Sequence, residues 1–191
     1  MLNASASRVK LLLLSTLTLA YGAAALPAAT LERLSLDDLI GKSTMIVRGK
    51  ILNSYTAASG PVIYTHYRIQ PSETLKGTTN GVVEIQLPGG TAGNLRQTFA
   101  GVPEFRAGDE YVFFLWTGKS GLTQVIGLTQ GLFAIAPGAS ADPVATRRAS
   151  GELMLAHGTG APVKNETLVM KVSELRSRIA ATLAAAGSAA Q

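Results

Sequence analysis

The two histidines, His66 and His157, are the side chains of this sequence best suited to proton transfer or to metal binding. They lie about ninety residues apart, and the chain has no cysteine to complete a zinc site with them. No H-E-x-x-H pattern occurs either. His66 falls on the polar face of a predicted strand and His157 in a predicted loop, so we expect both to be exposed and non-functional. The sequence predicts no metal site and no other cofactor.

Nucleophilic catalysis has no recognisable motif in this chain. Cysteine is absent, and no serine has glycine two residues before and two residues after it. The phosphate-binding loop and the G-x-G-x-x-G fingerprint are also absent. A Ser-His-Asp set assembled from distant positions stays open, because such triads are recognised by geometry. We therefore predict no catalytic residue and favour a non-catalytic protein over a hydrolase with an unrecognised active site.

The acidic pair Asp37-Asp38 and the single tryptophan, Trp116, each have a structural interpretation and a functional one. Asp37 and Asp38 could form a metal-binding or acid pair, but negative charge at the start of a helix explains them better. Trp116 could be a platform for a ligand, but we expect it to be part of the core.

One glycine-rich segment, residues 88–98, is the candidate binding loop. Glycines can expose backbone N–H groups to an anion, and Arg96 could add a charge-assisted bond to a carboxylate. The alternative is a wide hairpin loop that needs glycine for its backbone angles. The candidate residues are Gly89, Gly90, Gly93, Asn94, Arg96 and Gln97.

The elements that would position this loop are mostly short strands. A helix is predicted over 34–41, capped by Ser35 and ended by Gly41. Alternating apolar residues predict strands over 44–51, 63–70, 83–87, 110–116, 122–126 and 131–136, with a possible short strand over 95–99. Gly49 predicts a bulge or a close strand crossing, Ser59-Gly60-Pro61 a turn, and Pro71 a bend or a strand end.

We therefore expect a mainly β fold: a small antiparallel barrel of the OB type, or a sandwich, over residues 34–137. Residues 138–151 are predicted to be a flexible loop or linker. Residues 152–187 should supply a strand and a helix packed on the barrel, with Leu175, Ile179 and Leu183 on the buried face. Residues 188–191 should be a frayed tail.

The N-terminus has the pattern of a secretory signal peptide. Arg8 and Lys10 precede a short apolar run, and Ala23-Ala24-Ala25 supplies small residues for a signal peptidase. We expect cleavage after Ala25, with cleavage after Gly22 or Ala29 as the alternatives. The run is shorter than the ~20 residues that a membrane-spanning helix needs. Residues 26–33 would then form an N-terminal extension. This pattern predicts a periplasmic or extracellular protein with no membrane span after cleavage.

Charge and composition narrow the range of partners. Removing residues 1–25 takes away two positive charges and no negative one, so the formal charge falls from +5 to +3. The remaining Lys and Arg are scattered rather than clustered on one element, which argues against nucleic-acid binding. The lack of cysteine excludes disulfides, so packing alone must hold the fold.

Several motifs follow one another over about residues 34–136. They are Leu34-Ser-Leu-Asp-Asp-Leu-Ile, Met45-Ile-Val-Arg-Gly-Lys-Ile, Leu75-Lys-Gly, Leu87-Pro-Gly-Gly with Gly93 and Arg96-Gln, Phe105-Arg-Ala-Gly-Asp-Glu-Tyr-Val-Phe-Phe-Leu and Val125-Ile-Gly-Leu-Thr-Gln-Gly-Leu-Phe. Their order resembles that of a family of uncharacterised secreted bacterial β-rich proteins. The strand order also resembles the OB-type barrels of netrin-like and metalloprotease-inhibitor-like modules. Those inhibitors use an N-terminal cysteine and disulfides, which this chain lacks, so the resemblance carries over no mechanism.

The sequence thus favours a secreted, non-catalytic binding module for a protein, peptide or glycan. The narrowest prediction is a module accessory to an exported protease, with an exported protein or peptide as its partner. A hydrolase and a structural protein of the cell envelope are the alternatives. The oligomeric state does not follow from the sequence.

Overall fold

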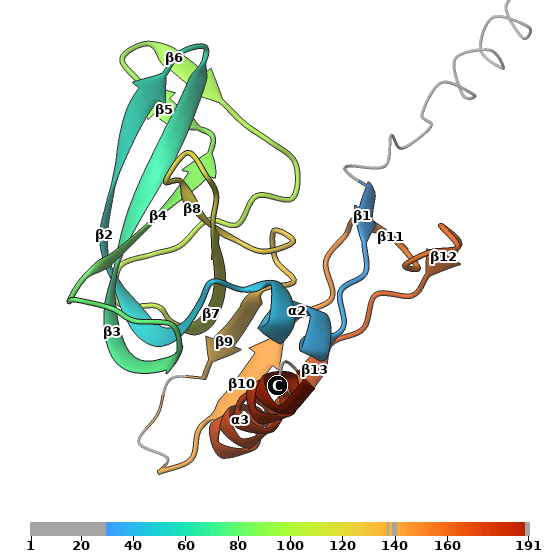
Figure 1. The fold of residues 1–191 in the computed structure, drawn as a ribbon. Helices are drawn as coiled ribbons and strands as arrows, with labels where there is room; N and C mark the ends of the chain where they lie inside the picture. The colour runs from blue at the N-terminus through green and yellow to red at the C-terminus, as the bar shows by residue number, and fades with distance from the viewer. Residues whose placement is uncertain (1–29, 137, 139–140, 190–191) are drawn as a thin grey trace, which may run out of the picture.

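A computed structural model describes residues 30–136, 138 and 141–189 (Figure 1). The predicted signal peptide, residues 1–25, lies outside the described residues. The helices are α2 (Leu36–Lys42) and α3 (Val172–Ala189). The strands are β1 (Thr30–Glu32), β2 (Met45–Ser59), β3 (Val62–Lys76), β4 (Val83–Pro88), β5 (Gly90–Ala92), β6 (Leu95–Gln97), β7 (Glu110–Thr117), β8 (Thr123–Val125), β9 (Leu132–Ile135), β10 (Val144–Arg147), β11 (Leu153–Leu155), β12 (Pro162–Val163) and β13 (Leu168–Lys171).

Most strands belong to one antiparallel sheet, ordered β13-β10-β9-β7-β2-β3-β4, with β8 paired to β7. Two small sheets, β1-β11-β12 and β5-β6, complete the strands. The prediction of a mainly β, antiparallel fold with a short N-terminal helix and a C-terminal helix is confirmed. Over the described residues the large sheet does not close on itself, so the sandwich-like alternative fits better than the barrel. No helix in the described part of the chain is long and apolar enough to span a membrane.

The long β2–β3 hairpin contributes the two longest strands of the large sheet (Figure 1). Gly60 and Pro61 connect the two strands, and the positive φ of Gly60, 59°, explains the glycine. The register shifts next to Gly49, which lies opposite Pro71. A Cβ at Gly49 would lie 2.6 Å from the Gln70 carbonyl oxygen, so the predicted close strand crossing is confirmed. β3 nevertheless continues beyond Pro71 to Lys76, so the prediction that Pro71 ends the strand is wrong, and the proline lies next to the register shift.

The sheet buries apolar side chains on both faces. Successive side chains of β7 belong alternately to two hydrophobic cores. Val112 and Phe114 pack with residues of α2 and α3 in the first core. Phe113 and Leu115 pack with residues of β2, β3 and β4 in the second. This double burial explains why Val112, Phe113, Phe114 and Leu115 are all apolar in succession, and none of them is exposed.

Helix α2 begins at a capping box. The Ser35 hydroxyl accepts a hydrogen bond from the Asp38 backbone N–H, and the Asp38 carboxylate accepts one from the Ser35 N–H. The structural interpretation of this acidic residue is therefore confirmed. At the other end of the helix, Lys76 donates to the Ile40 and Gly41 carbonyls.

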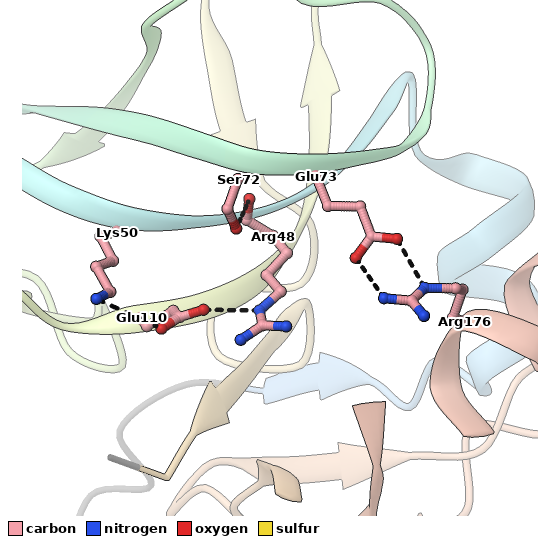
Figure 2. A network of polar contacts seen from close by, with 6 residues as sticks. All are labelled: Arg48, Lys50, Ser72, Glu73, Glu110 and Arg176. Atoms are coloured by element: carbon pink, nitrogen blue, oxygen red, sulfur yellow. Dashed lines mark hydrogen bonds and ion pairs between the residues drawn. The ribbon is translucent and has the colours of Figure 1, made fainter. Parts of the chain in front are cut away.

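Helix α3 lies across the same core as α2 (Figure 1). Leu175 and Ile179 are buried and Leu183 is partly buried, as the spacing predicted. Polar contacts at the helix edge add to this packing. Arg176 bonds both oxygens of Glu73, as Figure 2 shows, and Arg178 pairs with Asp37.

Several sequence expectations differ from the structure. Helix α3 continues to Ala189, so the first two residues of the predicted frayed tail, 188–191, are helical. Within 138–151, expected to be a flexible loop or linker, Val144–Arg147 form β10, which lies inside the large sheet between β9 and β13. Trp116 is 47% exposed, so its assignment to the core is wrong. It lies near the end of β7, where the sheet no longer covers it. Strands β1, β5, β12 and β13 were not predicted. Each is recognised by its pairing with another strand, which local alternation in the sequence does not show.

Candidate functional site

The candidate binding loop forms a small hairpin, β5–β6, beside the turn end of β2 and β3 (Figure 1). Four of the six predicted residues, Gly89, Gly90, Arg96 and Gln97, line one hollow on the surface. Gly93 and Asn94 lie between the two strands of this hairpin and are not part of that lining. The turn explains Gly93, whose φ is 58°.

Gln97 fastens the loop to the main hairpin. Its Oε1 accepts a hydrogen bond of 2.7 Å from the Ile63 N–H, and its Nε2 donates one of 2.7 Å to the Pro61 carbonyl. Both ends of the amide are used inside the protein, so Gln97 positions the loop rather than offering a free group to a ligand.

The glycines hold the loop close to β3. The Gly89 N–H donates to the Ile63 carbonyl at 2.7 Å, and the Gly89 carbonyl accepts from the Thr65 hydroxyl at 2.7 Å. The amide that an anion would need at Gly89 is therefore already bonded. A Cβ at Gly90 would lie 2.7 Å from Thr65 Oγ1, which explains this second glycine by close approach.

The hollow beneath the loop has a volume of about 220 Å³, and we call it the loop pocket. Its lining includes Tyr67, Leu87, Pro88, Gly89, Gly90, Arg96, Gln97, Phe99, Val102, Pro103 and Glu104. Tyr67 and Leu87 are buried and make an apolar floor. Burial raises the pKa of the Tyr67 phenol, which keeps it neutral at ordinary pH.

Apolar and charged groups stand exposed at the rim of the loop pocket. Phe99 lines the pocket and is 42% exposed. Leu95, next to Arg96 on β6, is 59% exposed but is not part of the lining. Arg96 and Glu104 are exposed and form no ion pair with any described residue. The rim thus offers uncommitted apolar surface together with one positive and one negative charge.

His66 is less exposed than predicted, and that expectation is wrong. Its side chain is 14% exposed, because the ring stacks on Tyr55 with centroids 4.5 Å apart. Nδ1 lies 3.0 Å from Glu84 Oε1, and the Tyr55 hydroxyl donates to the same carboxylate. These three side chains join β2, β3 and β4 across one face of the sheet, which gives His66 a structural role.

His157 lies near a hydroxyl and two acids, as a hydrolase would require, but they are connected differently. Its Nδ1 contacts Glu32, while Ser35 and Asp38 line the same hollow as His157. Ser35 Oγ donates to Asp38 Oδ2 at 2.6 Å, and no hydrogen bond joins this hydroxyl to His157 within the described part of the chain. The contact between nucleophile and base that acyl transfer needs is therefore not formed.

A larger polar hollow of about 530 Å³ lies beside β2 and β7. Figure 2 shows its central contact, in which Arg48 Nε donates to Glu110 Oε1 at 2.7 Å and Lys50 approaches the other oxygen at 3.9 Å. The carboxylate is thus already neutralised by two cations. Among the described residues no group of three or more His, Cys, Asp or Glu side chains could hold a metal ion.

Trp116 lines a third hollow, with Lys42, Gln124 and Val125 among its neighbours. The ring packs against Gly118, where a Cβ would lie 2.9 Å from the indole. The sequence does contain a signal for this exposure, because Trp116 is followed at once by Thr117 and the turn at Gly118–Gly121. An aromatic at the end of a strand has less sheet to cover it than one in the middle.

Comparison of the chain with protein-family models, with curated proteins and with solved structures gave no match. The resemblance to secreted β-rich proteins and to OB-type inhibitor modules therefore stays a prediction.

Proposed function

We propose that this chain is an exported, non-catalytic binding module that holds a short polypeptide segment of another exported protein in the loop pocket. The observation that carries the proposal is an exposed aromatic side chain, Phe99, on the lining of a hollow beside a loop that Gln97 holds in place. Leu95, the neighbour of the lining residue Arg96, adds a second exposed apolar side chain. Large exposed apolar side chains gathered around a concavity are typical of interaction sites.

The size of the loop pocket favours a polypeptide. A volume of about 220 Å³ holds one apolar side chain of a partner rather than a drug-sized ligand. Phe99 at the rim would extend the apolar contact beyond the pocket.

The charges at the rim favour an acidic residue in the partner. Arg96 is exposed and unpaired with any described carboxylate, so it can bind a carboxylate in two parallel hydrogen bonds. Glu104 on the pocket lining would repel a second acidic residue and so limit which segments fit.

The loop is held before any partner arrives, which lowers the entropy cost of binding. Gln97 and Gly89 supply bonds from the loop to β3 and to the β2–β3 turn. The N-terminal pattern of residues 1–25 supports export. A narrower role as an accessory of an exported protease stays the most specific form of this proposal, and no residue of the loop pocket supports it over another exported partner.

Peptide-library selection on the chain without residues 1–25 tests the proposal. We expect enriched peptides to carry an apolar residue next to Asp or Glu. Arg96→Ala should weaken their binding by about 10-fold, the scale of one charge-assisted hydrogen bond. Phe99→Ser should weaken it further, because the apolar contact is removed.

Arg68→Ala is the matched control, since Arg68 is exposed on β3 and is not part of the loop-pocket lining. Far-UV spectra should show that every variant stays folded. Selection of no peptide, or equal binding by the Arg96 and Arg68 variants, would reject the proposal. Binding only to a glycan array would point to the glycan alternative.

A further inference from the structure

A separate hollow lies where α2 begins, between β10 and the small β1-β11-β12 sheet, and we call it the arginine pocket. Its volume is about 340 Å³. The lining residues are Arg33, Leu34, Ser35, Leu36, Asp38, Arg147, Ala156, His157, Val163 and Leu168. None of them lines the loop pocket.

Arg147 is the unusual member of this lining. Arg147 is only 6% exposed, and its Nη1 is buried without a hydrogen-bond partner among the described residues. The guanidinium carbon lies 5.8 Å from the centroid of the Phe133 ring, so one face of the group rests on an aromatic side chain. Buried arginines are ordinarily paired, because an uncompensated buried charge is costly.

A second positive charge stands beside Arg147. Burial lowers the pKa of Arg147, and the nearby positive charge of Arg33 lowers it further. Arg33 is exposed and forms no ion pair within the described part of the chain. Two guanidinium groups therefore share one hollow with Asp38, and neither forms an ion pair with a described carboxylate.

The acids nearest to this hollow are already engaged. Asp38 accepts hydrogen bonds from the hydroxyl and the backbone N–H of Ser35. Glu32 contacts His157. Neither carboxylate forms an ion pair with Arg33 or Arg147 among the described residues.

The remaining walls indicate what kind of anion fits. Leu34, Leu36, Val163 and Leu168 make much of the lining apolar. A planar guanidinium matches a planar carboxylate, and apolar walls match an apolar body. Guanidinium groups match phosphate as well, so the apolar walls are what favour an organic carboxylate over inorganic phosphate.

We propose that the arginine pocket binds a small organic carboxylate with an apolar body. The carboxylate accepts hydrogen bonds from Arg147, Arg33 adds a second positive charge at the mouth, and the leucines contact the apolar body. This site is independent of the proposed function, because it shares no residue with the loop pocket.

Calorimetric titration of the chain without residues 1–25 tests this proposal with benzoate and butanoate as probes. Benzamide, which is neutral, and inorganic phosphate serve as comparisons. We expect saturable binding of the carboxylates and at least ~10-fold weaker binding of benzamide, because a hydrogen bond to a charged group is lost. The Arg147→Met variant should lose the carboxylate affinity by a similar factor.

Two further variants keep the test decisive. Arg33→Met, at an exposed position, should weaken carboxylate binding without unfolding the chain. Arg148→Met is the matched control, since Arg148 lines the hollow beside β7 instead and should leave binding unchanged. The thermal midpoint of ligand-free Arg147→Met should equal or exceed that of the unmodified chain, because an unpaired buried charge is removed.

Several outcomes would overturn the proposal. They are no saturable binding of either carboxylate, equal affinity for benzamide, tighter binding of phosphate, or unchanged affinity in both the Arg33 and Arg147 variants. A folded Arg147→Met variant with a lowered thermal midpoint would show that this arginine serves the fold instead.

Discussion

Arg176 on α3 makes two parallel hydrogen bonds to Glu73 on β3, with Nε to Oε1 at 2.7 Å and Nη2 to Oε2 at 2.8 Å (Figure 2). The pair joins the C-terminal helix to the main hairpin across 103 positions of sequence. It lies at the edge of the core that Leu175 and Ile179 fill, so it sets the orientation of a helix that apolar packing already holds.

Replacing this pair should change stability only modestly. The side chain of Arg176 is 49% exposed and that of Glu73 is 28% exposed. We expect Arg176→Met to cost about 0.5–1 kcal/mol of unfolding free energy, and less at high salt. Urea denaturation of the single variants and of the double variant with Glu73→Gln measures the coupling between the two residues.

Arg176→Lys is the control that keeps the charge and loses the two-pronged geometry. It should recover only part of the coupling. A loss well above 1 kcal/mol for Arg176→Met would contradict the view that apolar contacts hold α3.

The close approach of β2 and β3 at Gly49 predicts an intolerant position. A Cβ there would lie 2.6 Å from the Gln70 carbonyl oxygen and 2.7 Å from Ile69 Cγ2. We expect Gly49→Ala to destabilise the fold by about 1–3 kcal/mol, because backbone must shift to relieve the overlap. Thermal or urea unfolding measures the effect.

Gly41→Ala makes a matched control. Gly41 lies in α2, and a Cβ at this position meets nothing within 4 Å. This change should be neutral or should stabilise by up to about 1 kcal/mol, since alanine favours helix. Equal effects of the two substitutions would refute the assignment of Gly49 to a strand crossing.

The helix cap makes stability depend on pH in the acid range. Hydrogen bonds from Ser35 lower the pKa of Asp38 below its ordinary 3.8, and the hydrogen bond from Arg178 does the same for Asp37. The unfolded chain therefore binds protons more readily than the folded one. The stabilisation is fully present above pH 3.8 and is lost as the pH falls through the lowered values.

Unfolding free energies measured from pH 6 downward should therefore decline once the pH passes below about 4. Asp38→Asn should flatten this decline and lower the stability at neutral pH, because the charge at the helix start and the bonds to Ser35 are weakened. An unchanged acid slope in this variant would show that Asp38 does not carry the effect.

The β pattern and the two helices could be predicted from local sequence because each rests on neighbours along the chain. Ser35 and Asp38 lie three residues apart and cap one helix, and Leu175 and Ile179 lie four residues apart on one helical face. The crossing at Gly49 was also visible, since a glycine that interrupts an alternating strand is typical of a bulge or of a close backbone approach.

The sequence predicted the position of the candidate loop but not the contacts that hold the loop against the rest of the fold. Its glycines and Arg96 were visible in the sequence, and four of its six residues line the loop pocket. The sequence did not show that the Gln97 side-chain amide forms hydrogen bonds with the backbone of Ile63 and Pro61, which lie 34 and 36 residues earlier. Local composition carries no information about a partner that distant.

The sequence by itself determined the secondary structure that depends on local spacing: a mainly β chain with one capped helix and one amphipathic helix. Only the tertiary structure decided which side chains are buried away from solvent. Arg147 falls in residues 138–151, which local composition predicted to be a flexible loop or linker, yet it lies buried on β10 near Phe133, while its neighbour Arg148 lines a different hollow. The physical reason is that burial and charge pairing are set by contacts between distant segments, which no local pattern encodes.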